Sequence, residues 1–267
     1  MENIKEYVAN KKVVLHDYFY NLGKKANLTI IQVNHDEASN AYIRGKKKDC
    51  DEIGVEVNHL VLPLDTTEEE LLKVVDKLNH DDNVDGFFVQ MPLPKQINEE
   101  TIKRAITPSK DVDGFNPLSK YIPATPKGII EYLKDNGFVF RGKNAVVMGR
   151  SNIVGKPAQR ALLDLDMNVI NLHTKTTEED KKFYIEHADL LIVSIGHAGT
   201  VTNSYNFKEN CVVMDVGINR IDGHLYGDCV PDLKVAYQSP VPGGVGLLTR
   251  LALLINFMEV VKDKYGN

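Results

Sequence analysis

The sequence predicts an α/β protein of two βα domains, and three observations lead to this prediction. Short apolar runs typical of strands alternate with helix-like segments in both halves of the chain. A stretch rich in glycine, proline and aspartate, residues 108–126, separates the halves. In the second half, an apolar run at 145–148 breaks at Gly149 and leads into another helix-like segment. We therefore expect one domain at 1–118, completed by a C-terminal helix at 248–267, and a second at 119–247.

The first half contains three strand-like runs, at 28–33, 55–62 and 86–90. Helices are expected between and after them, at 35–53, 66–78 and 98–106. Gly54 provides the stop of the first helix, and the second opens with threonine caps followed by glutamates. This βα alternation predicts a parallel or mostly parallel sheet.

The second half opens with a helix that reaches about residue 136, for which Thr125 is a cap and Pro126 the first helical residue. Its four expected strands, at 145–148, 169–172, 190–194 and 212–216, are almost continuously apolar, as in a sheet covered on both faces. The last helix, at 248–264, is expected to be amphipathic and to pack against the first domain.

Composition excludes several classes of partner. Lys and Arg number 32 against 37 Asp and Glu, a net charge of −5, so nothing favours nucleic acid or an anionic membrane. The charged N-terminus is unlike a secretory signal, and no apolar run reaches the roughly 18 residues of a membrane span. Cys50, Cys211 and Cys229 lack disulfide-framework or metal-ligand spacing, so we expect packing residues, no metal site and a cytoplasmic protein.

The segment NAVVMGRSNIVGKP, residues 144–157, has the order strand, glycine-bearing turn, helix. Glycine lets the backbone approach a pyrophosphate, and a helix N-terminus offers free N–H groups to negative charge. With Gly149 and Gly155 alone, the spacing departs from G-x-G-x-x-G, and an ordinary βα turn is the alternative.

The next strand ends at Leu172-His173-Thr174-Lys175, where NAD-selective folds tend to place an acidic residue. This chain has hydroxyl and basic groups there. Arg150 with Thr174 could hold a 2′-phosphate, which indicates NADP, whereas Lys175 is better explained as an exposed surface residue.

Tyr42 and Lys46 are four residues apart and share a helix face, where a partly buried lysine could move protons. The alternative is that Lys46 belongs to the solvated charge run 44–48. Gln90 lies at the carboxyl end of a strand, where α/β sheets bind ligands, although it could instead bond nearby backbone.

Two loops are further candidates for ligand binding. Asp111 and Asp113 could either cap a turn or grip a polar heterocycle through paired hydrogen bonds. In residues 239–246, SPVPGGVG, prolines fix the direction and glycines allow the backbone to lie against a flat ligand, unless the loop is a plain connection.

Seven ordered segments resemble the bifunctional methylenetetrahydrofolate dehydrogenase/cyclohydrolase family, the FolD proteins. They are ASNAYIRGKKKDCDEIG, DGFFVQMPLP, KDVDGFNP, ATPKGIIEYL, GRSNIVGKP, VMDVGINR and SPVPGGVG. The resemblance implies two domains with a cleft between them, the first holding folate and the second a Rossmann-type NADP-binding domain. A shikimate- or malate-type dehydrogenase and a catalytically silent nucleotide-binding regulator are the rival interpretations.

The resemblance also assigns roles. Lys46 matches the family's catalytic lysine, Gln90 the glutamine beside it, Tyr42 the tyrosine that stacks on the aminobenzoyl ring, and Asp113 the pterin-binding residue. The implied NADP contacts are Gly149, Arg150, Ser151, Thr174 and, on the nicotinamide side, Ile218. Further folate contacts are implied at Gly246 and Thr249.

The implied activity is oxidation of 5,10-methylenetetrahydrofolate with NADP, followed by hydrolysis to 10-formyltetrahydrofolate, in one-carbon and purine metabolism. The implied partners are the folate substrate and a second copy of the chain in a homodimer. The chain departs from the usual family residues at three positions, Asn34 for glycine, Ala124 for cysteine and Leu247 for proline.

Overall fold

The computed structural model describes residues 1–266, and the chain divides into two compact units. The Lys46 unit comprises Ala9–Ala124 and the chain from Arg250 onward, and the Gly149 unit comprises Met1–Val8 and Thr125–Thr249. Residues 1–8 thus group with the second half of the chain, not with the first domain where the sequence placed them.

Hydrogen bonds explain the placement of the N-terminus. It begins a helix that the sequence did not predict, α1 (Ile4–Asn21), and contacts α5 (Ala124–Asp135). Tyr7 donates to Oδ2 of Asp135 at 2.8 Å, and Tyr132 donates to the carbonyl of Glu2 at 2.5 Å. These bonds join residues more than 120 positions apart, so no local pattern reveals them.

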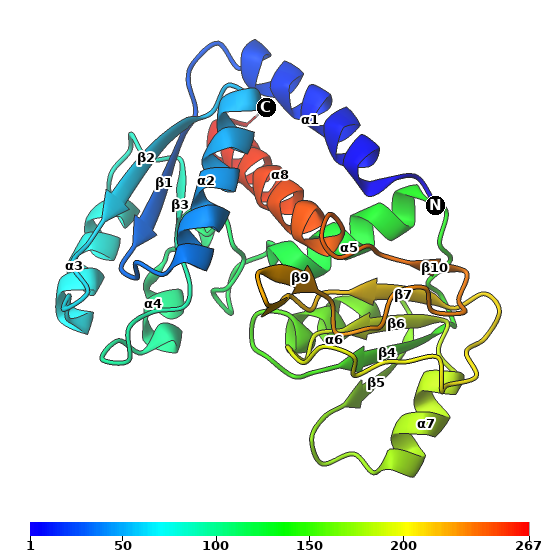
Figure 1. The fold of residues 1–267 in the computed structure, drawn as a ribbon. Coiled ribbons are helices and arrows are strands. Elements are labelled where there is room, and N and C mark those ends of the chain that lie inside the picture. Colours follow the sequence, from blue (N-terminus) through cyan, green and yellow to red (C-terminus); the bar gives the residue numbers. More distant parts are fainter. Residues whose placement is uncertain (267) are drawn as a thin grey trace. The chain divides into compact units, whose positions relative to one another are not determined.

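The Lys46 unit contains a three-stranded parallel sheet in the order β2-β1-β3 (Figure 1). The strands are β1 (Asn27–Gln32), β2 (Glu56–Val61) and β3 (Gly86–Val89), connected by α2 (Glu37–Glu52) and α3 (Glu68–Asn79). The helix α4 (Glu99–Ala105) and the 3₁₀ turn η1 (Pro108–Lys110) follow β3. The parallel sheet of βα repeats is the predicted arrangement, with ends that differ from the expected ones by one or two residues.

Side-chain caps set the helix starts in this unit. Asp36 accepts from the backbone N–H of Ser39 at 2.8 Å and starts α2 two residues later than expected. Thr67 and Glu70 form a reciprocal capping box at α3. Asn98 caps α4. Buried aliphatic and aromatic side chains from β1, β3, α3 and α4 pack together into one core of this unit. Its members include Ile31, Val33, Leu71, Val75, Phe87 and Ile102.

The last helix, α8 (Val245–Tyr265), is buried rather than amphipathic. Four consecutive residues, 251–254, are each at most 2% exposed, so no polar stripe separates two faces. Even Asn256 is buried and donates to the carbonyls of Val112 and Ile122, at 2.9 and 3.0 Å. Phe257 stacks on Phe19 of α1, with ring centroids 5.7 Å apart. The part of α8 from Arg250 onward is therefore a core helix of the Lys46 unit.

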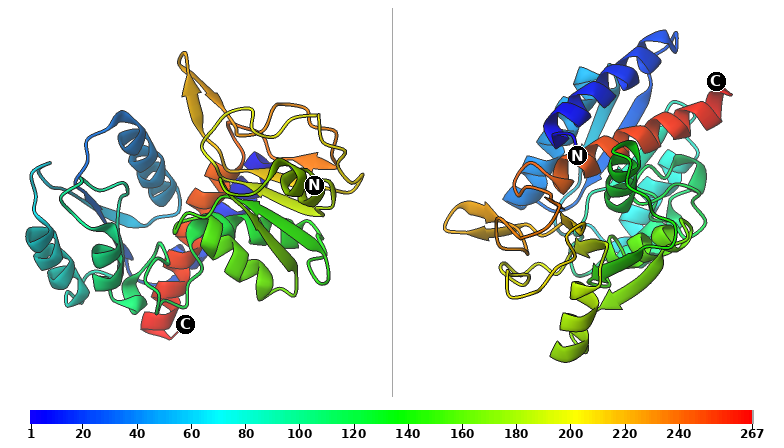
Figure 2. Two further views of the ribbon diagram at one scale, coloured as in Figure 1. Left: turned by 90° about the horizontal axis from the view of Figure 1, so that it is seen from below. Right: turned by 90° about the vertical axis from the view of Figure 1, so that its right-hand side faces the viewer.

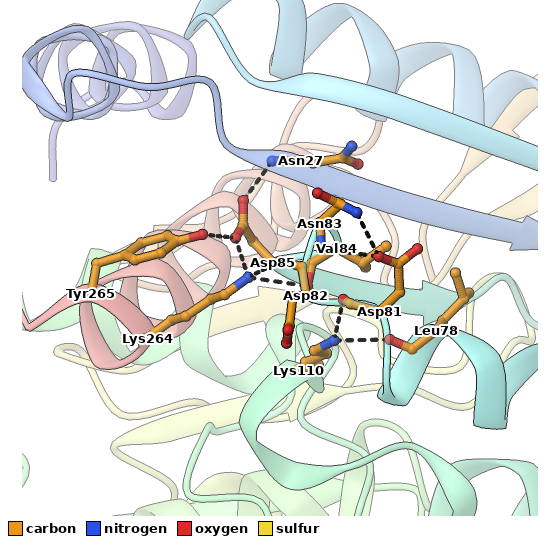
Figure 3. Close-up of polar contacts among 10 residues, drawn as sticks. All are labelled: Asn27, Leu78, Asp81, Asp82, Asn83, Val84, Asp85, Lys110, Lys264 and Tyr265. Carbon is orange, nitrogen blue, oxygen red and sulfur yellow. Dashed lines mark hydrogen bonds and ion pairs between the residues drawn. The ribbon is translucent and has the colours of Figure 1, made fainter.

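A buried carboxylate anchors the end of α8 (Figure 3). Asp85, 3% exposed, accepts from Nζ of Lys264 at 2.7 Å, from the hydroxyl of Tyr265 at 2.5 Å and from the backbone N–H of Asn27 at 2.8 Å. Nearby, Nζ of Lys110 donates to the carbonyls of Leu78 and Asp81. Since Asp85 directly precedes β3 and Asn27 opens β1, this anchor lies at the amino end of the sheet.

The Gly149 unit contains a five-stranded sheet in the order β10-β7-β6-β4-β5, and every pair is parallel. The strands are β4 (Asn144–Met148), β5 (Asn168–Leu172), β6 (Leu190–Val193), β7 (Val212–Asp215) and β10 (Tyr237–Gln238). Within the unit the strands run 2-1-3-4-5, a doubly wound order whose direction of winding reverses between β4 and β6. Ligands of such sheets bind at the carboxyl ends beside that reversal.

Besides α5, this unit has α6 (Gly155–Leu163) and α7 (Glu178–Glu186), and an antiparallel hairpin formed by β8 (Asn219–Ile221) and β9 (His224–Tyr226). Figure 2 shows the hairpin projecting from the sheet of its unit. The sequence did not predict α7, the hairpin or β10. All three elements are short, so each contains too few residues to show a hydrophobic periodicity.

The three cysteines are free thiols and all are buried, as expected for packing residues. Cys211 and Cys229 lie in the core of the Gly149 unit beside Val146, Leu191 and Val213.

Among the described residues, no helix combines the length and the apolar character needed to cross a membrane.

Candidate functional site

The side chain of Lys46 is buried in the Lys46 unit. It is 5% exposed, whereas Arg44, Lys47 and Lys48 are exposed, so the charge run is solvated except at this residue. Nζ of Lys46 donates to Oε1 of Gln90 at 3.2 Å. It also lies 3.8 Å from the ring centroid of Phe88 and 5.1 Å from that of Tyr42. An amine among aromatic rings and one amide oxygen has little water around it.

This environment shifts the protonation of Lys46. Burial lowers the pKa of Lys46, because the ammonium form loses its hydration. The carboxylate of Asp113 opposes this shift, and the positive charge of Arg250 adds to it. A lysine with a lowered pKa can exchange protons near neutral pH, which an exposed lysine does poorly.

Strand register brings Gln90 and Asp113 to the same end of the sheet. Phe87 of β3 pairs with Asp111 through a parallel bridge, so the chain after Asp111 runs alongside β3 in the same direction. Gln90 follows β3 directly, and its Nε2 donates to the carbonyl of Met91 at 2.8 Å. Gln90 therefore bonds local backbone, as the alternative interpretation had it, and also the amine of Lys46. Its binding of a ligand stays a prediction.

The two aspartates of this loop differ in their partners. Asp111 caps a turn, accepting from the N–H of Gly114 at 3.1 Å and from that of Asn116 at 2.8 Å. Burial raises the pKa of Asp111 to about 6. Asp113 is 8% exposed and faces the ammonium groups of Lys46 and Lys103. Burial raises the pKa of Asp113, and those two cations partly offset the rise. Asp111 is thus the turn cap, and the ligand-binding role of Asp113 stays a prediction.

Sequence reasoning missed a polar network at the carboxyl end of β1. Gln32, 2% exposed, donates to Oδ1 of Asn40 at 2.7 Å, and its Oε1 lies 2.9 Å from Nε2 of His59. Asn34 donates to the carbonyl of Pro92 at 2.6 Å. Polar residues after a buried strand are the signal that could have indicated this network. These bonds connect the carboxyl end of β1 to α2, to β2 and to the exit of β3.

The turn after β4 is shaped for close approach by another group. Gly149 has φ +115°, and a Cβ there would lie 2.3 Å from the carbonyl oxygen of Ser194. A Cβ on Gly155 would lie 2.5 Å from the carbonyl oxygen of Gly149. Oγ of Ser151 accepts from the backbone N–H groups of Val154 and Gly155, at 3.1 and 3.3 Å. The turn therefore presents bare backbone and the start of α6, a cradle that fits a pyrophosphate.

The groups expected at a 2′-phosphate lie in the same unit. Arg150 is exposed in the turn after β4, and Thr174 and Lys175 are exposed in the turn after β5. Because β4 and β5 are adjacent and parallel, these two turns leave the same edge of the sheet. Nδ2 of Asn171 donates to the carbonyl of Gly149 at 2.7 Å and links them. The residues present thus fit an NADP molecule.

Two buried aspartates that the sequence did not single out shape the loops after β6 and β7. Asp228 is fully buried and accepts from the backbone N–H groups of Ile195, Gly196 and His197, at 2.6, 2.9 and 2.9 Å. Asp215 accepts from the N–H groups of Gly217, Asp228 and Cys229, at 3.0, 3.0 and 2.9 Å. The bonds span up to 33 residues, so sequence offers no signal for them.

The remaining expected contacts also lie in the Gly149 unit. Ile218 follows β7 and is 60% exposed. Gly246 lies in the first turn of α8, where a Cβ would meet nothing within 4 Å. Thr249 donates to the carbonyl of Val245 at 3.0 Å, and its Oγ1 lies 3.1 Å from Oγ1 of Thr125. Within residues 1–266, no group of three or more His, Cys, Asp or Glu side chains is arranged to hold a metal ion.

Comparison with known proteins matches the two halves of the chain to the two domains of one family. Residues 1–113 match the family described as tetrahydrofolate dehydrogenase/cyclohydrolase, catalytic domain, and residues 123–265 match the corresponding NAD(P)-binding domain. A Bifunctional protein FolD of Bacillus cereus is 44% identical over 248 residues, which cover 88% of this chain and 86% of that protein.

Solved structures of the same family have the same fold as this chain. The bifunctional enzyme FolD of Campylobacter jejuni superposes with a TM-score of 0.94 at 36% identity, covering 98% of each chain. The dehydrogenase-cyclohydrolase of Trypanosoma brucei, solved with NADP cofactor and inhibitor, gives a TM-score of 0.92 at 27% identity and covers 99% of this chain and 97% of that one. The chain belongs to the tetrahydrofolate dehydrogenase/cyclohydrolase family.

Proposed function

We propose that the protein oxidises 5,10-methylenetetrahydrofolate to 5,10-methenyltetrahydrofolate with NADP and hydrolyses the product to 10-formyltetrahydrofolate. The observation that carries this proposal is the buried amine of Lys46, bonded to Gln90 and facing Asp113, in a chain whose two halves match the two domains of the family. A family member without this amine could still bind both ligands but would lack a group to move protons.

In the first reaction a hydride leaves the one-carbon bridge of the folate, and NADP supplies the hydride acceptor when bound. The Gly149 unit has the parts to hold it. Gly149 and Gly155 leave room at the pyrophosphate, and Ser151 fixes the turn between them. Arg150 and Thr174 would hold the 2′-phosphate, because a guanidinium and a hydroxyl can both donate to phosphate oxygens. Ile218 would contact the nicotinamide side.

The folate contacts are those that the family resemblance implies. The carboxylate of Asp113 would accept hydrogen bonds from the pterin N–H groups, which charge assistance strengthens. The ring of Tyr42 would stack on the aminobenzoyl ring. Gly246 and Thr249 would provide further contacts. Hydride loss leaves a methenyl cation whose charge is shared by two nitrogens.

In the second reaction water attacks the methenyl carbon. The neutral amine of Lys46 would accept a proton from that water, while Oε1 of Gln90 holds the amine in place. The resulting ammonium would return a proton to the ring nitrogen as its bond to the carbon breaks. The products are 10-formyltetrahydrofolate and one released proton, which balances the hydrolysis of the cation.

Two finer assignments rest on the family resemblance. We infer that the protein acts as a homodimer in the cytoplasm, where it would serve one-carbon metabolism and purine synthesis. Sedimentation equilibrium at several concentrations tests the dimer, and a mass of one chain at every concentration would reject it.

The test of the function is spectrophotometric. The purified protein is mixed with 5,10-methylenetetrahydrofolate and NADP or NAD, and the reduced cofactor and the methenyl chromophore are followed separately. We expect NADP to be reduced faster than NAD and the methenyl signal to stay low because it is hydrolysed. Absence of any reduced cofactor would reject the dehydrogenase, and a persistent methenyl signal would reject the cyclohydrolase.

A further inference from the structure

A cluster of charges around one buried carboxylate joins α1, α2 and α8 in the Lys46 unit. Its centre is Asp49, which is 1% exposed. Asp49 accepts from Nε of Arg250 at 2.5 Å and from its Nη2 at 2.7 Å, a bidentate pair, and also from Nζ of Lys12. Nζ of Lys12 reaches Glu52 at 2.6 Å as well. The proposed reaction leaves all four residues without a role.

Gly45 determines where the guanidinium lies. A Cβ on Gly45 would be 2.6 Å from Nη1 and 2.9 Å from Cζ of Arg250, so the guanidinium rests directly on the α2 backbone. This is the residue before Lys46. Gly45 and Asp49 are four apart and share one face of α2, next to the face that carries Lys46. A glycine inside a helix is unfavourable, and the close approach of Arg250 explains this one.

We propose that Arg250 is a positioning residue for the proton transfer by Lys46. Asp49 clamps its guanidinium against Gly45, and from there its positive charge favours the neutral amine of Lys46, the form that accepts a proton from water. The inference deepens the proposed function and rests on it, since it assumes that the amine of Lys46 is the proton acceptor.

The groups that face Lys46 come from each element around it. On α2 they are Tyr42 and Cys50, and burial raises the pKa of the Cys50 thiol to about 12, which keeps it neutral. The exit of β3 contributes the uncharged Gln90. The loop after η1 contributes Asp113, which favours the ammonium form, and α8 contributes Arg250, which opposes it. Arg250 therefore offsets part of the effect that the Asp113 carboxylate has on the Lys46 amine.

The cluster itself makes Arg250 a fixed charge. Asp49 is shared by Lys12 and Arg250, and within the cluster Arg250 is the member whose charge acts on Lys46. An unclamped arginine would swing toward water, where its field on the amine would be screened. Clamping costs little here because the carboxylate receives donors at both oxygens.

The test is a direct titration of the Lys46 amine. Nζ of lysine is labelled with ¹⁵N, and the Lys46 resonance is identified by its loss in Lys46→Met. In Arg250→Gln we expect the titration midpoint to rise by about 0.5 on the pH scale or more, because a nearby cation no longer disfavours the ammonium. Arg250→Lys keeps the charge and should stay close to the parent. An unchanged midpoint in a folded Arg250→Gln protein would overturn the proposal.

Kinetics provide a second readout. In Arg250→Gln the rising limb of the cyclohydrolase pH profile should move by the same amount as the midpoint, while the KM for methenyltetrahydrofolate stays unchanged. A midpoint higher by that amount corresponds to about a threefold lower rate on the rising limb, since the neutral fraction there falls about tenfold when the pKa rises by one. A lowered rate with an unshifted limb would show a purely structural role and reject the proposal.

Two further variants serve as an independent test and as a control. Gly45→Ala keeps every charge but pushes the guanidinium away, so it should also raise the midpoint, and it serves as the test if Arg250→Gln does not fold. Lys264→Met removes another ion pair of α8, the one with buried Asp85, and should leave the Lys46 midpoint unchanged. A shift in Lys264→Met as large as that in Arg250→Gln would overturn the proposal. The titration is independent of activity, so failure of the proposed function shows separately, as cyclohydrolase activity retained in Lys46→Met.

Discussion

Lys46 donates from Nζ to Oε1 of Gln90 across 3.2 Å, and this bond connects the middle of α2 to the exit of β3. An amide oxygen can accept a hydrogen bond from an ammonium and also from a neutral amine. Gln90 can therefore hold Lys46 in one orientation through both halves of a proton-transfer cycle. A carboxylate in its place would hold the ammonium far more strongly than the amine.

The first prediction follows from that difference. Gln90→Glu should raise the pKa of Lys46 and lower the cyclohydrolase rate at neutral pH by about tenfold or more, because a carboxylate near a lysine stabilises its charged form. The measurement is the pH profile of methenyltetrahydrofolate hydrolysis. Gln96→Glu, an exposed position of the same unit, is the matched control and should behave like the parent. A profile of Gln90→Glu that coincides with the parental one would contradict the role of Gln90.

Cofactor selectivity provides the second prediction. Arg150→Ala should weaken NADP binding about tenfold or more and leave NAD nearly unaffected, because one charge-assisted contact to the 2′-phosphate disappears. KM values for the two cofactors measure the effect. Arg141→Ala, which removes another exposed arginine of the Gly149 unit, controls for net charge. Equal losses for NADP and NAD would argue against a 2′-phosphate contact.

The third prediction concerns the turn after β4. Gly149→Ala should destabilise the protein by about 2–4 kcal/mol and raise the KM for NADP, since its backbone is left-handed and the new Cβ would clash with the carbonyl of Ser194. Gly246→Ala should leave stability within about 0.5 kcal/mol of the parent, because its site is open. Urea unfolding measures both. If the two variants have the same free energy of unfolding, the close approach of the Ser194 carbonyl to Gly149 does not constrain the turn.

The fourth prediction is a pH dependence of stability. Burial raises the pKa of Asp111 from 3.8 to about 6 in the folded protein, so the folded state holds this proton more tightly than the unfolded chain. The resulting stability is present below pH 3.8 and is lost as the pH rises through about 6. It amounts to about 3 kcal/mol, the free energy that corresponds to the difference between the pKa of the folded and of the unfolded state.

Asp111→Asn removes that dependence. The difference in unfolding free energy between parent and variant should favour the parent most near pH 4 and shrink toward pH 7. Asp65→Asn, an exposed aspartate of the same unit, should show no such trend. A difference that stays constant between pH 4 and pH 7 would mean that Asp111 is not buried as the structure has it.

Local sequence patterns predicted most of the βα elements and both sheets. Strand ends and helix starts were recognisable because glycines, threonine caps and apolar runs act within a few residues. The glycine turn at Gly149 and the spacing of Tyr42 and Lys46 are equally local. These features were therefore within reach of the sequence.

The errors have a common physical origin in long-range contacts. The first residues of α1 join the Gly149 unit through Tyr7 and Asp135. The part of α8 from Arg250 onward is buried on consecutive positions because it packs against the rest of α1 and against β3. Asp49 and Arg250 meet across 201 residues. Their pairing leaves no trace in spacing, although a glycine inside the α2 helix marks the place where another group must approach.

The most direct test of the account uses Lys46→Met with 5,10-methylenetetrahydrofolate and NADP, following the reduced cofactor and the methenyl signal together. Methionine preserves much of the apolar stem but removes the amine. We predict that cofactor reduction continues while the methenyl product accumulates, with hydrolysis lowered by about 10² or more. Disappearance of the methenyl signal at the parental rate would contradict the central claim that the Lys46 amine carries the proton in hydrolysis.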